Sequence, residues 1–243
     1  MMYLSRLILA PRNQAVRRDL ADCQDLHRTV LSGFPQTTSG ASGTGGARER
    51  FGILHRVDTT RTGIELYVQS NLEPNWDQLP TGYLLPTVGG NPVCKRIDEL
   101  YAGLSSATPL RFRLCANPTK RLHVGTGKDG SGAGKRVDLR REEDQLAWLE
   151  AKAQSGGFAL CYVQANPHVV NVRQMPGGRV TGNRSRRGAA TTERAPLTFG
   201  SVLFEGELQV TDSLLFLSTL EQGIGSGKAY GFGLLSIAPA AAP

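Results

Sequence analysis

One order of secondary structure recurs in both halves of this chain, and it restricts the fold more than any other feature. A buried strand is predicted over residues 3–10, followed by a helix over 17–34, where apolar side chains recur every three or four residues. Two more strands are predicted over 51–57 and 64–70, joined by a polar turn as in a hairpin. The order strand, helix, strand, strand is typical of an α+β unit with its helices on one face of a mostly antiparallel sheet.

The second half repeats a similar mixed order. Its predicted elements are a strand over 110–116, a helix over 142–154, a strand over 158–164, a hairpin around Glu205 and Gly206, a helix over 212–222 and a final strand. Between the halves, residues 71–109 are rich in proline and glycine, which favours a boundary there. We therefore expect two domains, 1–90 and 109–243, joined by a linker over 91–108.

The distribution of positive charge points to a polyanionic partner. The 243 residues carry a net charge of +7, but residues 111–141 alone carry +7 and residues 173–194 carry +5. Such clusters favour a nucleic acid over a merely solvated surface. The second cluster overlaps residues 176–195, whose Gly/Arg-rich composition predicts disorder in the absence of a partner.

Several other classes of protein fit poorly. No apolar run reaches the roughly 18 residues of a membrane span, and the apolar stretch near the N-terminus is too short for a signal peptide, so we expect a cytoplasmic protein without membrane contact. The four cysteines lie far apart and no Cys/His ligand spacing occurs, which argues against zinc and against a disulfide scaffold. We expect no metal and no cofactor.

His27 and a glycine-rich run are the first candidates for chemistry. His27 sits at the border of the apolar stripe of the predicted helix, where the pattern alone favours a structural histidine over a general acid or base. The run 223–233 (GIGSGKAYGFG) could bring its backbone and Lys228 close to a ligand, or could be a structural turn. It is neither a Walker A loop nor a Rossmann fingerprint. If phosphodiester chemistry occurs here, metal-free acid–base catalysis on RNA fits best, because the 2′-hydroxyl is a built-in nucleophile.

Three groups of segments together resemble a known family. They are YLSRLILAP with RRDLADCQDLHRTV near the start, RFRLCANPTKR with GKRVDL and QLAWLEAKAQSGGF in the middle, and VLFEGELQVTD with LEQGIGSGKAYGFGLLSIAP at the end. In this order they resemble the CasE-type CRISPR-associated endoribonucleases of type I-E systems. The resemblance covers nearly the whole chain.

The resemblance implies two tandem ferredoxin-like (RRM-like) domains. It also implies metal-independent cleavage of precursor CRISPR RNA within each repeat, on the 3′ side of a stem-loop. The enzyme would then keep the mature guide RNA and join the other subunits of the Cascade complex. Its partners would therefore be the repeat RNA and Cascade proteins.

The resemblance also implies roles for individual residues. His27 matches the family's catalytic histidine, which protonates the 5′-oxygen leaving group or takes the 2′ proton. Gln24 stands where members of the family carry tyrosine, and Ser32 where some carry lysine. Arg28, Lys228 or Arg173 could supply positive charge in place of that lysine.

Binding to the RNA is expected along the basic excursion and the glycine-rich run. The residues expected to contact phosphate are Lys120, Arg121, Lys128, Lys135, Arg136 and Arg140. Gly225 and Gly227 would pack near the cut strand. Two alternatives stay open: an RNA-binding subunit with little or no catalytic activity, and a nucleotide-binding enzyme that uses the glycine-rich loop.

Overall fold

The structure is a computed structural model. It describes residues 1–36, 46–61, 63–86, 90–104, 109–121, 136–167, 179–185 and 194–240. None of the helices within these residues combines the length and the apolar character that crossing a lipid bilayer would require.

The first half forms a four-stranded antiparallel sheet in the order β2-β3-β1-β4. Its strands are β1 (Tyr3–Leu9), β2 (Leu54–Thr60), β3 (Gly63–Ser70) and β4 (Val93–Arg96). Two helices, α1 (Gln14–Ala21) and α2 (Cys23–Ser32), follow β1, and the short α3 (Ala47–Arg50) precedes β2. A 3₁₀ turn, η1 (Trp76–Gln78), stands between β3 and β4, where a ferredoxin-like unit has its second helix.

The single helix expected over 17–34 is wrong in detail, because the chain breaks at Asp22. Asp22 has an extended backbone, and its side chain accepts a hydrogen bond from the Gln24 backbone, so it caps the start of α2. Val16 of α1 and Val30 of α2 nevertheless belong to one core. The apolar spacing continued across the break, which is why it predicted one helix instead of two.

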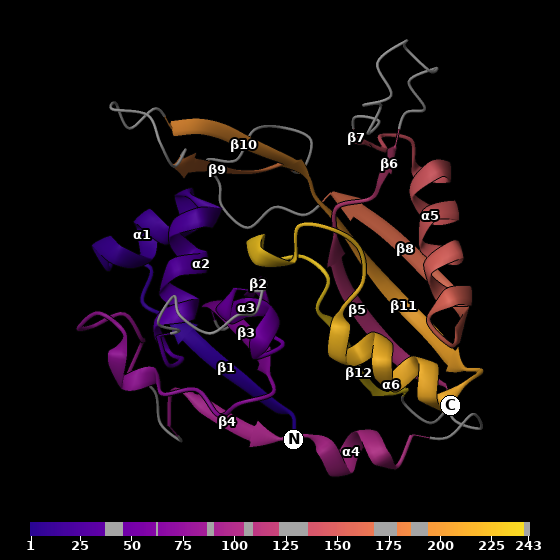
Figure 1. The fold of residues 1–243 in the computed structure, drawn as a ribbon, viewed down its shortest axis with the longest axis horizontal. Coiled ribbons are helices and arrows are strands. Elements are labelled where there is room, and N and C mark those ends of the chain that lie inside the picture. Colours follow the sequence, from indigo (N-terminus) through magenta and orange to yellow (C-terminus); the bar gives the residue numbers. More distant parts are fainter. Residues whose placement is uncertain are drawn as a thin grey trace.

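The second half repeats the topology with the strand order β12-β5-β11-β8. Its strands are β5 (Leu110–Ala116), β8 (Phe158–Pro167), β11 (Val202–Val210) and β12 (Leu235–Pro239), all paired antiparallel. The helices α5 (Glu142–Ser155) and α6 (Ser213–Gln222) lie together on one face of this sheet (Figure 1). The prediction of two tandem ferredoxin-like α+β units is confirmed.

The hairpin expected around Glu205 and Gly206 is wrong, since β11 runs through both residues as one strand. A Cβ at position 206 would overlap the carbonyl oxygen of Tyr162 in β8. The glycine therefore marks a close approach of two backbones rather than a turn.

Two short hairpins extend from the second sheet. One consists of β6 (Thr119–Arg121) and β7 (Arg136–Asp138), within the basic excursion. The other consists of β9 (Arg179–Ser185) and β10 (Arg194–Gly200), and it reaches over to lie beside α2 (Figure 1). The expected disorder over 176–195 is thus wrong for 179–185 and 194–195, which form strands.

The segment expected as a linker contributes to both halves. β4 pairs with β1, and α4 (Asp98–Ala102) follows it directly. Ile97 and Tyr101 belong to the same buried core as Phe112 of β5 and Phe204 of β11. Residues 91–102 are therefore packed structure rather than a free tether.

Candidate active site

His27 lies where the two halves of the molecule meet. Its ring centroid is 6.4 Å from that of His55 on β2, with the rings near parallel, and 6.2 Å from that of Tyr230, with the rings edge to face. Tyr230 belongs to η2 (Lys228–Tyr230), a 3₁₀ turn in the C-terminal glycine-rich loop. The fold thus brings together one helix, one strand and one loop that are far apart in the sequence.

Both imidazoles are neutral at pH 7. Burial, together with the positive charges of Arg48 and Arg28, lowers the pKa of His27 to about 4. Burial, with contributions from His27 and Arg48, lowers the pKa of His55 to about 3. His55 is 1% exposed, and its Nε2 has no hydrogen-bond partner among the described residues. A neutral imidazole has a nitrogen that can accept a proton, which is the form a general base requires.

The other residues of α2 that were expected to take part in catalysis are Arg28, Ser32 and Gln24, and the first two bond to neighbours within the helix. The Arg28 guanidinium forms an ion pair with Asp25 at 2.5 Å and is exposed. The Ser32 hydroxyl donates a hydrogen bond of 2.8 Å to the Thr29 carbonyl. Gln24 is half-buried one helical turn before His27, which places it on the same side of the helix. The catalytic roles of these residues stay predictions.

The glycine-rich loop has a defined shape held by backbone hydrogen bonds. The Ile224 N–H donates to the Gly233 carbonyl at 2.9 Å, and the Gly233 N–H donates to the Cys115 carbonyl on β5 at 2.8 Å. Gly227 and Gly231 flank η2 with φ angles of 74° and 91°, a region that glycine adopts without strain. This loop carries Tyr230, which packs against His27, and Lys228, which lines the cavities described next.

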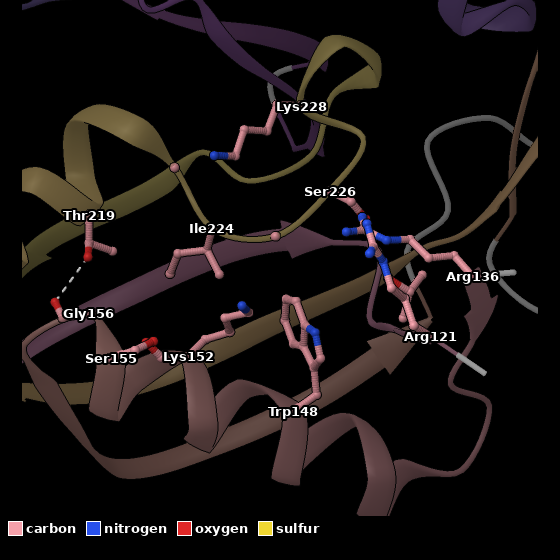
Figure 2. A pocket seen from close by; sticks show the side chains of 13 residues that line it. Arg121, Arg136, Trp148, Lys152, Ser155, Gly156, Thr219, Ile224, Ser226 and Lys228 are labelled. Atoms are coloured by element: carbon pink, nitrogen blue, oxygen red, sulfur yellow. Dashed lines mark hydrogen bonds between the residues drawn. The ribbon is translucent and has the colours of Figure 1, made fainter. Parts of the chain in front are cut away.

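A cationic cavity of about 390 Å³ lies between α5 and this loop (Figure 2). Its charged lining consists of Arg121, Arg136, Lys152 and Lys228. None of the four forms an ion pair with a carboxylate in the part of the chain that the structure describes. Burial, with the nearby charges of Arg48 and Lys152, lowers the pKa of Lys228. The cavity therefore holds an excess of positive charge that favours an anion.

A second cavity, of about 290 Å³, adjoins the first at Lys228. Arg48 from α3 lines it, and so do Glu49 and Glu221. Arg48 and Lys228 line this second cavity together, and the charge of Arg48 lowers the pKa of His27, of His55 and of Lys228.

The expected RNA-binding residues divide into three groups. Arg121, Arg136, Gly225 and Lys228 line the cationic cavity. Lys120 and Arg140 are exposed, at β6 and after β7, and Gly227 precedes η2 as its N-cap. Lys128, Lys135 and Arg173 lie outside the described residues. Their contacts with RNA stay predictions.

Sequence reasoning did not identify five residues of this site: Arg48, His55, Trp148, Lys152 and Tyr230. The spacing of Trp148 and Lys152, four residues apart, places both on one helix face and was an available signal. Among the described residues, no group of three or more His, Cys, Asp or Glu side chains is placed to hold a metal ion.

Comparison with known proteins gives consistent results. A family model described as "CRISPR associated protein" matches residues 2–239. The CRISPR-associated endoribonuclease Cse3 of Thermus thermophilus is 36% identical over 250 residues, covering 98% of this chain and 100% of the relative. The CRISPR system Cascade subunit CasE of Escherichia coli is 29% identical over 243 residues, with coverage of 98% and 100%. A solved structure of Cse3 bound to a 19-nucleotide RNA superimposes with a TM-score of 0.69 at 34% identity, covering 98% of this chain and 99% of that one.

Proposed function

This chain belongs to the family of CRISPR-associated proteins, and from that membership we propose that it is a metal-independent endoribonuclease acting on precursor CRISPR RNA. It cuts within the repeat, on the 3′ side of a stem-loop, and keeps the mature guide as a Cascade subunit in the cytoplasm. Full-length relatives named as an endoribonuclease and as a Cascade subunit support this assignment. The observation that carries it is a neutral, half-buried His27 that packs against Tyr230, on the same turn as Lys228 of the cationic cavity.

The proposed reaction is an intramolecular transesterification. The 2′ oxygen of the ribose forms a bond to the adjacent phosphorus, and the bond from phosphorus to the 5′ oxygen breaks. One product ends in a 2′,3′-cyclic phosphate, which water can open to a 3′ phosphate, and the other begins with a 5′-hydroxyl. The 2′-hydroxyl loses a proton and the 5′ oxygen gains one, so the step neither consumes nor releases protons overall.

The state of His27 supports the role of base for the 2′ proton. With a pKa of about 4, the ring is unprotonated at neutral pH and its acceptor nitrogen is available. The attacking and leaving oxygens stand roughly in line on opposite sides of phosphorus, so one imidazole cannot face both at once. The proton for the 5′ oxygen therefore comes from a different group or from water.

Charge on the phosphoryl oxygens must be stabilised while the bonds change. Arg28 forms an ion pair with Asp25 and Arg48 with Glu49, and the charges of both arginines lower the pKa of His27. Fixed cations in a partly desolvated site stabilise such charge more than they would in water. Arg28 and Arg48, whose charges act on His27, are accordingly the cations favoured for this task.

A second candidate function is an RNA-binding subunit with little turnover. It is favoured by the Ser32 hydroxyl, which bonds to its own helix, and by Gln24, whose amide cannot act as a base. This candidate predicts tight binding of the stem-loop without cleavage.

The His27→Ala substitution tests the proposed function. In a single-turnover assay with the cognate repeat RNA in EDTA, we expect the cleavage rate to fall by about 10²- to 10⁴-fold while binding persists, because only the proton acceptor is removed. One 2′-deoxy substitution at the cut site should abolish cleavage by the unaltered protein. Glu73→Ala, at an exposed position outside both cavities, is the matched control and should leave the rate unchanged.

The outcomes separate the candidates. Cleavage that survives both the alanine at position 27 and the missing 2′-hydroxyl would refute the roles given to His27 and to the nucleophile. Tight binding by the unaltered protein with no cleavage in EDTA or in magnesium would favour the second candidate. Cleavage that requires magnesium would contradict a metal-independent mechanism.

A further inference from the structure

The cationic cavity contains an aromatic side chain that the chemistry at His27 does not use. Trp148 projects from α5 into the space beneath the glycine-rich loop, between Lys152 on one side and Arg121 and Arg136 on the other (Figure 2). The indole is half-buried and packs against the edge of the second core. A large apolar ring held among cations at a cavity wall is typical of nucleotide recognition.

The surroundings of Trp148 fix the position of its ring. The indole lies near parallel to the Phe204 ring of β11, with centroids 6.3 Å apart. Across the cavity wall, a Cβ at position 225 would come within 3.0 Å of the indole Cζ2, so Gly225 lets the loop backbone approach the ring closely. The ring is thus preorganised, and little conformational entropy is lost when a ligand contacts it.

The charges around the indole suit a phosphate group. Lys152 follows Trp148 by four residues on the same helix face, Lys152 and Lys228 both line the cavity, and the charge of Lys152 contributes to the lowered pKa of Lys228. Neither lysine has a carboxylate partner among the described residues. Two ammonium groups that line one cavity without counter-charge repel each other, and a bound phosphate relieves that repulsion.

The size of the cavity restricts what can enter. About 390 Å³ lies at the lower end of the range for small-ligand sites, which is enough for one nucleotide but not for a duplex. Proteins read RNA sequence mainly at unpaired bases that stack on aromatic side chains. A single unpaired nucleotide therefore satisfies all three constraints: its base can stack on the indole, its phosphate can bind the lysines, and its size suits the volume of the cavity.

We propose that this cavity is a subsite for one unpaired nucleotide of the RNA substrate, with its base stacked on Trp148 and its phosphate between Lys152 and Lys228. The site adjoins the cut phosphodiester, because Lys228 and Tyr230 belong to the same 3₁₀ turn and Tyr230 contacts His27. The inference rests on the proposed function, since it assumes that RNA crosses the glycine-rich loop.

The test measures whether the loss of one base from the RNA and the loss of one side chain from the protein have the same effect on binding. Repeat RNAs with one abasic position each are bound to the His27→Ala protein, in which cleavage does not interfere, and Kd is measured for each. We expect one unpaired position near the cut site where removal of the base weakens binding about 5- to 150-fold. The same removal should have no effect once Trp148→Ala is added.

Matched variants separate the subsite from general damage. Tyr162→Ala removes an exposed aromatic ring of the same domain outside the cavity and should leave the abasic profile unchanged. Trp148→Leu keeps apolar volume against Phe204 and should also lose the coupling, which guards against misfolding of the alanine variant. Lys152→Ala should reduce the salt dependence of RNA binding by about one phosphate contact, whereas Lys95→Ala, exposed on β4, should not.

The result that overturns the subsite is an abasic profile identical in the His27→Ala protein with and without Trp148→Ala or Trp148→Leu. If the unaltered protein still cleaves the repeat, the subsite alone is refuted and the proposed function stands. If the unaltered protein neither binds nor cleaves the repeat, the proposed function is refuted and the subsite falls with it.

Discussion

At the residue scale, the sequence singled out His27, the proposed proton acceptor, but not the residues around it. His27 was ambiguous by helical spacing alone, and only its match to a family segment favoured a catalytic role. Its electrostatic environment depends on Arg48, which is 21 positions away in the chain and follows a polar, glycine-rich stretch without periodicity. No local pattern predicts that such a residue folds back toward His27, because that contact depends on tertiary packing.

The influence of Arg48 on His27 gives a testable pH dependence. A nearby cation disfavours the charged imidazolium, so removing it in Arg48→Gln should raise the pKa of His27 from about 4 toward its ordinary 6.5. Because the base must be neutral, the acid limb of the kcat/KM profile should move to higher pH, by about one unit or less. NMR titration of the His27 ring in the free protein measures the same shift directly.

Arg50→Gln is the matched control for this shift. Arg50 lies on the same short helix, is exposed and stacks on the Phe51 ring at 5.5 Å, so its removal should leave the titration of His27 unchanged. Equal shifts in the two variants would show a general surface-charge effect and contradict the specific contribution of Arg48.

At the element scale, hydrophobic periodicity and turn residues predicted where strands and helices occur. They did not decide the local structure at residues that are compatible with two conformations. Gly206 resembled a turn residue, yet it lies within β11 because the backbone of β8 passes too close for a side chain. Asp22 could be an interior helix residue or a cap, and it acts as the cap of α2. In both cases the deciding contact comes from outside the local segment.

The glycine-rich loop gives the prediction at this scale. Gly223 has φ 73° and ψ 165°, and a Cβ there would lie 2.8 Å from the Gly233 carbonyl oxygen that closes the loop. Gly223→Ala should therefore lower both the free energy of unfolding, by roughly 1–3 kcal/mol from backbone strain, and the cleavage rate. Urea denaturation and the single-turnover assay measure the two effects.

Gly90→Ala separates the effect of backbone strain from the effect of a steric clash between a new Cβ and its neighbours. Gly90 also has a positive φ, of 89°, but a Cβ there meets nothing within 4 Å. This variant should lose some stability and keep its cleavage rate. If Gly223→Ala likewise leaves cleavage intact, the shape of the loop is not required for the reaction.

At the scale of the whole molecule, a buried charge network joins the two halves. Arg56 on β2 donates two hydrogen bonds to Asp58 and three across the boundary, to the Leu234 and Arg113 carbonyls and to the Ser236 hydroxyl. Arg113 on β5 in turn donates to Asp58 at 3.2 Å. Burial alone would raise the pKa of Asp58, but the two guanidinium groups lower it below its ordinary value.

Sequence reasoning could not have found this network, because Arg56 and Leu234 stand 178 positions apart and neither belongs to a motif. The network matters for function because it holds β2, which carries His55, against the strand that follows the glycine-rich loop. The histidine pair and the cationic cavity can therefore form one site only while the two halves stay in register.

Asp58→Asn tests this coupling between the halves. The substitution leaves the Arg56 guanidinium, 3% exposed, without its counter-charge, and breaking a buried pair in this way typically costs about 3–5 kcal/mol. Trp76 reports on the first half and Trp148 on the second, so single-tryptophan versions followed by fluorescence in urea show each half separately. We expect coincident transitions in the parent protein and separated ones in Asp58→Asn.

Glu143→Gln is the control. It removes the ion pair between Arg141 and Glu143, whose side chains are 77% and 83% exposed, and should leave the transitions coincident. Coincident transitions in Asp58→Asn as well would mean that the shared apolar core, not the charge network, keeps the halves in register.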